Sequence, residues 1–101
     1  MSKWADYCIT AVSFNTKHTH IEEVRRRVDN GDTLGTGSDV SRETVVADIK
    51  RGVTYVTVFK DDKGDWRKGQ AVFIVTINGE EYIKTVEDRT TKDNLDNLPE
   101  F

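Results

Sequence analysis

The clearest pattern of apolar and polar positions lies in residues 71–86, where two apolar, β-branched runs flank Asn78-Gly79. This dipeptide readily adopts the two positive φ angles of a type I′ turn, so the pattern predicts a β-hairpin with a two-residue loop. The resulting register pairs residues across the hairpin as Ile77–Glu80, Val75–Tyr82, Ile74–Ile83 and Phe73–Lys84. Because the first strand is apolar on both faces, we expect the hairpin to form the middle of a curved sheet that is covered on two sides.

Two further strands are predicted before and after the middle of the chain. Residues 7–14 (YCITAVSF) alternate between two faces in the way that a strand requires. Residues 53–60 (VTYVTVFK) are rich in β-branched and aromatic side chains, which favour extended structure.

Residues 21–28 (IEEVRRRV) fit two structures. Ile21, Val24 and Val28 have the spacing of one helical face, and local signals lean slightly towards a helix. In a strand, Val24, Arg26 and Val28 would share one face instead, followed by a good turn sequence.

One helix is predicted at residues 41–51. The hydroxyl of Ser41 can accept a free N–H of the first turn, and Val45 and Ile49 belong to one apolar stripe. Gly52 supplies the left-handed residue with which helices commonly end.

These elements predict an α+β fold for residues 1–101 as one small domain. We expect a curved antiparallel sheet or partly open barrel of about five strands with one helix, in the order β-β-α-β-β-β. The strands are expected at residues 7–14, 21–28, 53–60, 71–77 and 80–86. Residues 92–101 form a tail that we expect to dock on the sheet.

Composition sets the scale of the core and the kind of surface. The chain has 101 residues, of which 36% are hydrophobic and 33% charged, so one lean core and a well-solvated surface are expected. A net charge of −3 argues against a general DNA coat but permits a local basic patch.

Cysteine usage and the apolar runs indicate the compartment. Cys8 is the only cysteine, so no internal disulfide can form and a reducing cytoplasm is expected. We find no secretory signal pattern and no apolar run near the roughly 20 residues of a membrane span, so we expect a soluble protein without a membrane partner.

The order of short motifs resembles a bacterial family catalogued as a domain of unknown function, family 3892. The similar stretches are YCITAV, HIEEVRRRVDNGD, a Ser-Arg-Glu helix start that ends in IKRG, NGEEYIKT and the most specific one, DNLDNLP. The resemblance implies that residues 21–28 form a strand, and we adopt that interpretation. It implies no catalytic residue.

Two candidate metal sites are weak. His18 and His20 lie on one side of an extended segment, but two ligands are too few and loop histidines explain them better. Asp61, Asp62 and Asp65 surround a glycine as in a calcium loop, yet the spacing of ligands and the closing Glu are missing, so a solvated turn is the better interpretation. We therefore expect no cofactor.

The sequence offers no catalytic constellation. The glycines of residues 31–37 lack the Lys of a phosphate-binding loop, and Cys8 has no basic neighbour in sequence. An enzyme would need a pocket that gathers scattered acids such as Asp48 or Glu81. We expect no enzymatic activity.

A basic and aromatic surface is the first candidate binding site. It would neutralise phosphate and stack on bases of nucleic acid, and it consists of Arg25, Arg26, Arg27, Trp66, Arg67 and Lys68. Nearby acidic residues offset much of the arginine charge, so a mixed-charge solvated strand is the simpler interpretation.

The C-terminal tail is the second candidate, either docked on the sheet or engaged with a partner. Its relevant residues are Asp93, Asn94, Leu95, Asp96, Asn97, Leu98 and Phe101. We favour docking, because a lean core gains roughly 1.5–3 kcal/mol from each large apolar side chain that it buries.

The leading functional hypothesis is a non-enzymatic binding or accessory module with an unidentified protein partner. Its small size and acidity suggest a phage- or mobile-element-borne protein. The second hypothesis is a nucleic-acid-binding domain that uses the surface around Arg25–Arg27 and Trp66–Lys68.

Overall fold

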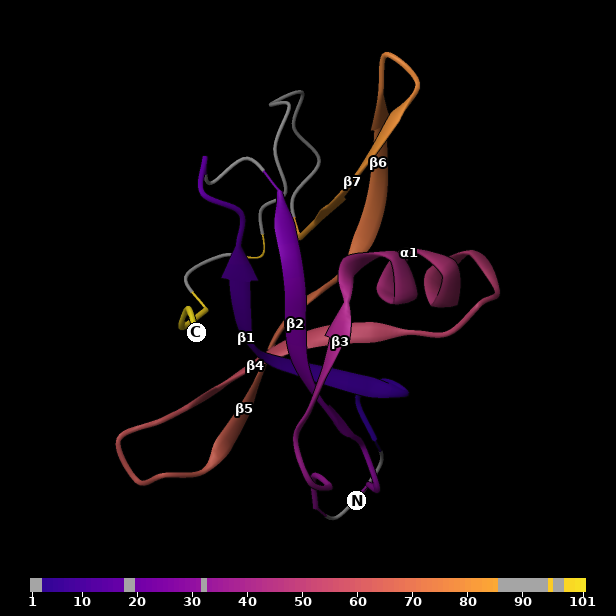
Figure 1. Ribbon diagram of the computed structural model, residues 1–101. Coiled ribbons are helices and arrows are strands. Elements are labelled where there is room, and N and C mark those ends of the chain that lie inside the picture. Colours follow the sequence, from indigo (N-terminus) through magenta and orange to yellow (C-terminus); the bar gives the residue numbers. More distant parts are fainter. Residues whose placement is uncertain (1–2, 18–19, 32, 86–94, 96–97) are drawn as a thin grey trace.

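The computed structural model describes residues 3–17, 20–31, 33–85, 95 and 98–101. The described chain is an α+β fold with one helix and seven strands (Figure 1), which confirms the predicted class but exceeds the predicted five strands. In chain order the elements are β1 (Tyr7–Phe14), β2 (Ile21–Val28), β3 (Ser38–Ser41), α1 (Arg42–Lys50), β4 (Tyr55–Lys60), β5 (Trp66–Ala71), β6 (Phe73–Ile77) and β7 (Glu80–Lys84).

Strand β1 lies at the centre of a five-stranded sheet with the order β3-β2-β1-β4-β5. All neighbours are antiparallel except β1 and β4, which run parallel because the chain crosses over through α1 between them. The sheet is open and strongly twisted, so that β2 and β4 cross in Figure 1.

The predicted hairpin has the predicted register, from Ile77 opposite Glu80 to Phe73 opposite Lys84. Asn78 and Gly79 have φ angles of 53° and 83°, as a type I′ turn requires. Its predicted place in the fold is wrong, because among the described residues β6 and β7 pair only with each other, in a separate two-stranded sheet.

The apolar character of both hairpin faces has another cause than a central position. One face contributes Ile83 to the main core, and the other forms a small cluster of its own with Val75, Ile77 and Tyr82. Between β5 and β6 the chain turns at buried Val72, whose N–H donates to Tyr55 O at 2.9 Å. This turn separates the hairpin from the larger sheet.

The helix and strand β2 agree with the sequence predictions. Ser41 is the N-cap and its side chain accepts the N–H of Thr44 at 3.2 Å, while Gly52 follows the helix with φ 94°. Residues 21–28 form a strand, as the family resemblance implied and against the local lean towards a helix. Pairing with β1 on one side and β3 on the other outweighs the local signal.

Strand β1 bends at Thr10, where its register with β2 shifts by one residue. The first half pairs with β4 as far as Ile9, and the second half turns away from it (Figure 1). The edge that this bend opens is occupied by the C-terminal residues: Val12 N–H donates to Pro99 O and Phe101 N–H donates to Val12 O, each at 2.9 Å.

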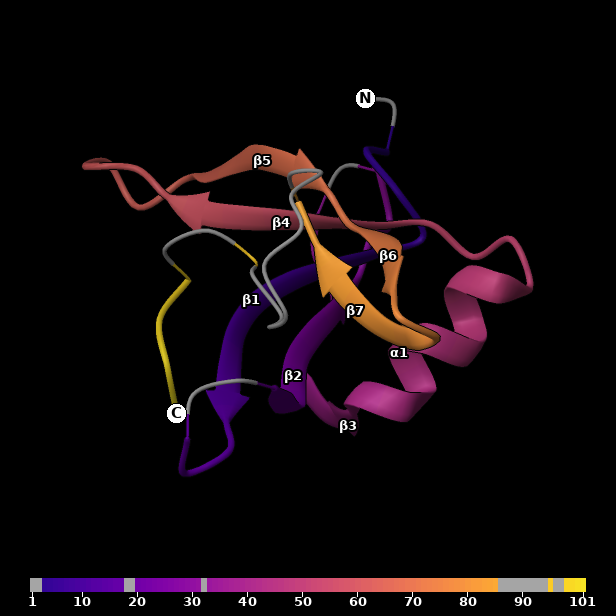
Figure 2. The ribbon, with the colours of Figure 1, turned by 90° about the horizontal axis from the view of Figure 1, so that it is seen from above.

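Two hydrophobic clusters occupy opposite faces of the large sheet. The main cluster joins Ile9 and Val24 of the sheet to Val45 of α1 and to the hairpin, which lies beside α1 in Figure 2. The second cluster lies on the other face, which we call the helix-free face, and contains Ala5, Cys8, Val56 and Val58.

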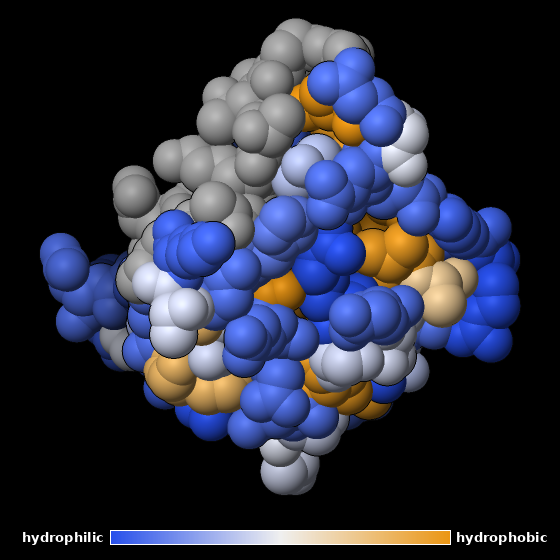
Figure 3. All heavy atoms as spheres, turned by 45° about the horizontal axis from the view of Figure 1, so that its top comes forward, coloured by the Kyte–Doolittle hydropathy of each residue, from blue (hydrophilic) through white to orange (hydrophobic). Residues whose placement is uncertain are grey.

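One side of the molecule is mostly polar. Figure 3 shows hydrophilic side chains over most of one side of the molecule, with apolar side chains only in small separate areas. No helix in the described part of the chain is long and apolar enough to cross a membrane.

Candidate functional site

The helix-free face carries both tryptophans of the chain. Trp4, Trp66 and Leu34 pack against its small apolar cluster and are themselves only partly buried. They come from three separate segments: the stretch before β1, the start of β5 and the loop between β2 and β3. The tertiary structure therefore assembles an aromatic surface that no single segment contains.

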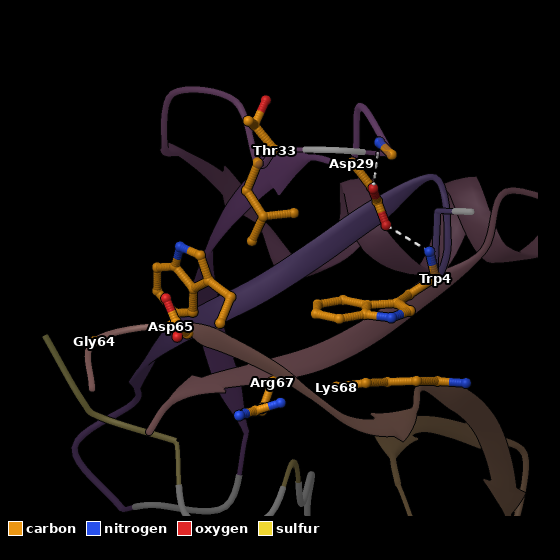
Figure 4. Close-up of a pocket in the computed structure, with 10 residues that line it drawn as sticks. Trp4, Asp29, Thr33, Gly64, Asp65, Arg67 and Lys68 are labelled. Atoms are coloured by element: carbon orange, nitrogen blue, oxygen red, sulfur yellow. Dashed lines mark hydrogen bonds between the residues drawn. The ribbon is translucent and has the colours of Figure 1, made fainter. Parts of the chain in front are cut away.

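A cleft of about 600 Å³ lies at this surface. Both indoles line it together with Leu34, and Arg67 and Lys68 contribute to it from β5. Figure 4 shows Thr33 and Asp29 on one side of the Trp4 ring and Arg67 and Lys68 on the other. The cleft thus combines flat apolar surface with cationic side chains at its border.

Two more cations lie close to Trp66. Arg27 Cζ is 5.5 Å and Lys60 Nζ is 5.0 Å from the centre of the indole, within the range of cation–π attraction. Neither of them forms an ion pair with a carboxylate within the described residues, and the same is true of Lys68. Arg27 uses one N–H to bind Gly35 O at 2.9 Å.

Asp29 lines the cleft, and its carboxylate accepts hydrogen bonds from the backbone of two neighbouring segments. Its carboxylate accepts the backbone N–H groups of Trp4 at 2.6 Å and Gly31 at 2.8 Å, and it is also approached by Ala5 N–H. Burial alone would raise the pKa of Asp29, but these N–H donors outweigh it and hold the pKa below its usual value. This carboxylate positions Trp4.

Cys8 is buried next to Asp29, with 3.8 Å between Sγ and Oδ2, and is not a reactive thiol. Burial raises its pKa to about 12, and the neighbouring Asp29 carboxylate adds to the shift. Because only the thiolate is a strong nucleophile, Cys8 is a packing residue.

The structure brings together part of the basic and aromatic surface predicted from the sequence. Arg25 and Arg27 both lie on the helix-free face, on either side of Gly37, where an added Cβ would lie 3.5 Å from Arg25 Cγ and 3.8 Å from Arg27 Cζ. Arg25 is neutralised by Asp39, with 2.9 Å between Nε and Oδ1. Of the two arginines, Arg27 is therefore the one that combines with Trp66 to form a basic and aromatic surface.

Two of the predicted contact residues have other roles. Arg26 points to the opposite face, where it binds Asp48 at 3.0 Å and the hydroxyl of Tyr55. Arg67 pairs with Asp61 at 2.7 Å across the β4–β5 turn. Both arginines are engaged within the fold, although Arg67 still lines the cleft.

The pair Arg26–Asp48 belongs to a buried polar network between β2, α1 and β4. Asp48 accepts the hydroxyl of Tyr55 at 2.8 Å and also binds Arg51. The Tyr55 hydrogen bond and the two arginines lower the pKa of Asp48 despite burial, so the carboxylate is charged in the folded protein. Asp48 is thus structural, and it does not converge with Glu81, which pairs with Lys50 at 2.8 Å.

The candidate metal residues take part in local structure. Asp61 Oδ1 accepts the N–H groups of Lys63 and Asp65, each at 2.9 Å, and so holds the turn between β4 and β5. His20 stacks on Tyr82 and lies 3.2 Å from Glu80, whereas His18 falls outside the described residues. Where the structure is described, no three His, Cys, Asp or Glu side chains gather in a way that could hold a metal.

The part of the tail that is described docks on the sheet. Leu95 is buried in the main core and Leu98 packs against it. Phe101 stays partly exposed, with Arg25 Cζ 4.3 Å from its ring centre. Asp93, Asn94, Asp96 and Asn97 lie outside the described residues.

Trp4 and Lys60 were not predicted from the sequence. Trp4 precedes the first predicted strand, and no periodic pattern connects it to a site. Lys60 and Trp66 flank the turn predicted around Asp61–Asp65, which is a weak indication that they face each other. Their pairing could not be predicted, because β5 itself was not predicted.

Comparison with known proteins identifies the family. No curated protein and no solved structure matches the chain. A family model described as "Protein of unknown function (DUF3892)" matches residues 8–99. This range covers nearly the whole chain, including the strands, the helix and most of the cleft, and the protein therefore belongs to the DUF3892 family.

Proposed function

We propose that the protein is a non-enzymatic binding module and that the cleft on its helix-free face binds single-stranded nucleic acid. The observation that carries the proposal is the position of Trp66. It lines the cleft, and Arg27 and Lys60 lie over its ring while both remain without a carboxylate partner in the described structure. Indole surfaces stack on bases and cations neutralise phosphates, which together bind single strands with little dependence on sequence.

Two features favour a single strand over a duplex. The aromatic surface needs unstacked bases, which a duplex does not offer. The chain as a whole carries a net charge of −3, so it lacks the broad positive field that attracts duplex DNA. Binding is expected to depend on the few cations at the cleft.

A protein partner is the second candidate, favoured by exposed apolar side chains. Val28 and Phe59 are 47% and 51% exposed, although both belong to strands of the main sheet. Such a partner would bind in a reducing, cytoplasmic compartment, which the lone buried Cys8 suits. If the protein binds a protein partner instead of nucleic acid, no binding of oligonucleotides is expected.

The test is fluorescence anisotropy of a labelled ten-nucleotide single strand at low salt. Trp66→Ala is expected to weaken binding roughly five- to 150-fold, because each base that stacks on an aromatic ring gains about 1–3 kcal/mol. Phe59→Ala is the matched control, since Phe59 is an exposed aromatic residue of the adjacent strand that does not line the cleft.

The outcome decides between the two candidates. Equal loss in both variants would point to a general effect on the fold, and circular dichroism of each variant checks for it. No binding by the native protein at low salt contradicts the nucleic-acid proposal and favours the protein partner.

A further inference from the structure

One carboxylate of the cleft is free. Asp65 lines the cleft directly before Trp66, and its side chain is exposed and forms neither a hydrogen bond nor an ion pair with any described residue. Asp65 stabilises the turn through its backbone: its N–H donates to Asp61 Oδ1 and its carbonyl oxygen accepts Asp61 N–H, each at 2.9 Å. The turn between β4 and β5 therefore does not require a carboxylate at this position.

The position of this carboxylate differs from that of Asp29. Asp29 already accepts hydrogen bonds from the backbone N–H groups of Trp4, Ala5 and Gly31 and from the Cys8 thiol. Asp65 lies across the cleft from Trp4 in Figure 4, on the border that also carries Arg67. A free negative charge beside cations repels the phosphates of a nucleic acid, so it weakens binding unless the ligand supplies hydrogen-bond donors to it.

A base stacked on an indole lies parallel to the ring, and its hydrogen-bonding edge points sideways, where a neighbouring side chain can reach it. Guanine has two adjacent donors on its Watson–Crick edge, N1–H and N2–H, which fit the two oxygens of one carboxylate. Adenine, cytosine and uracil present at most one donor there, next to an acceptor that a carboxylate repels. Only guanine therefore turns the charge of Asp65 into an attraction.

We propose that Asp65 is a specificity residue that selects guanine at the tryptophan-lined cleft. This inference rests on the proposed binding of single strands. In the complex the base stacks on indole surface, its N1–H and N2–H donate to Asp65, and Lys68 and Arg67 lie at the border where the phosphates pass. Guanine recognition requires no change in the fold, because no described residue binds the Asp65 side chain.

The test compares five RNA pentanucleotides that differ in the central base: UUGUU, UUAUU, UUCUU, UUUUU and UUIUU, where I is inosine. Inosine keeps N1–H and lacks the N2 amino group. Quenching of intrinsic tryptophan fluorescence reports binding directly, because the two tryptophans of the chain both line the cleft. UUGUU is expected to bind about tenfold more tightly than each of the others, the size of a good two-bond contact.

Asp65→Asn separates base recognition from simple repulsion. Asparagine keeps the shape and the backbone hydrogen bonds, but an NH₂ donor replaces one of the two acceptor oxygens, so it cannot pair N1–H and N2–H side by side. The variant is expected to bind UUGUU and UUIUU equally and to bind UUUUU slightly more tightly than the native protein does. Asp62→Asn is the matched control, since Asp62 is an exposed aspartate of the same turn that does not line the cleft, and it is expected to leave the guanine preference intact.

Each result has one interpretation. Equal binding of all five pentanucleotides, with binding still lost in Trp66→Ala, overturns guanine selection and leaves the proposed function standing. A guanine preference that survives Asp65→Asn overturns the role of Asp65. If the native protein binds no pentanucleotide and no longer single strand, both proposals fail.

Discussion

At the scale of single residues, buried carboxylates hold this protein together through hydrogen bonds. Asp29 ties the segment before β1 to the end of β2, and Asp48 ties α1 to β2 and β4. Both have pKa values below the usual range, so both are charged in the folded protein. A carboxylate with a lowered pKa stabilises the fold above its unfolded pKa of about 3.9, and the contribution is lost as the pH falls through the folded value.

The first prediction concerns Asp48. We expect Asp48→Asn to lower the free energy of unfolding by roughly 1–3 kcal/mol at pH 6, because it weakens charge-assisted hydrogen bonds in a buried network. We also expect this variant to lose less stability than the native protein between pH 6 and pH 2.5, since it lacks one of the groups whose protonation destabilises the fold. Urea unfolding at both pH values measures this.

Asp62→Asn serves as the control for that measurement, since Asp62 is exposed on a turn. It should follow the native protein at both pH values. An equal acid-induced loss in Asp48→Asn and in the native protein would contradict the assigned role of Asp48.

At the scale of elements, the bend of β1 determines how the C-terminal residues are used. Because β1 leaves β4 after Ile9, the second half of β1 has an open edge, and the backbone around Glu100 pairs with Val12 there. Open edges favour unwanted pairing with other chains, so covering this one is useful to the fold. Leu95 completes the cover by entering the main core, where it is 2% exposed.

The second prediction concerns this docking. Leu95→Ala is expected to lower the free energy of unfolding by about 2–4 kcal/mol, because it removes a buried side chain and leaves a cavity. Thermal unfolding measures the change, with Phe101→Ala as the control, since Phe101 remains partly exposed. A free tail, the alternative in which these residues bind a partner, would leave the stability of both variants near that of the native protein.

At the scale of the whole molecule, the negative net charge and the cationic cleft have separate consequences. The net charge of −3 keeps phosphate from being attracted over long distances. Arg27, Lys60 and Lys68 act only near the cleft, where they have no carboxylate partner within the described structure. Binding of a single strand is therefore expected to be modest and local.

The third prediction is the salt dependence of that binding. Three phosphate contacts on a single strand predict a slope of about −2 for log K against log salt concentration, since each contact adds about −0.7. Lys68→Gln removes one of these contacts and should reduce the magnitude of the slope by about 0.7. Lys50→Gln should not change the slope, because Lys50 lies on α1 and pairs with Glu81. A slope near zero would show that cations do not hold the ligand.

Much of the local structure was predictable, and the site was predictable only in part. The Asn78-Gly79 turn, the register of the hairpin and the caps of α1 depend on neighbouring residues, and all were predicted correctly. Strand β5 was missed because WRKGQA has almost no apolar periodicity and is held by its pairing with β4. At the cleft, Trp66 and Lys68 were predicted, while Trp4 was not.

The sequence by itself determined the hairpin with its Asn78-Gly79 turn, strands β1 and β4 and the capped helix, because turn chemistry, caps and apolar periodicity act over a few residues. Only the tertiary structure decided that β1, and not the hairpin, is the centre of the sheet. It also decided which arginine faces Trp66 and which faces Asp48. Those outcomes depend on pairing between segments far apart in the chain, such as Tyr7 with Tyr55, and local patterns do not encode that pairing.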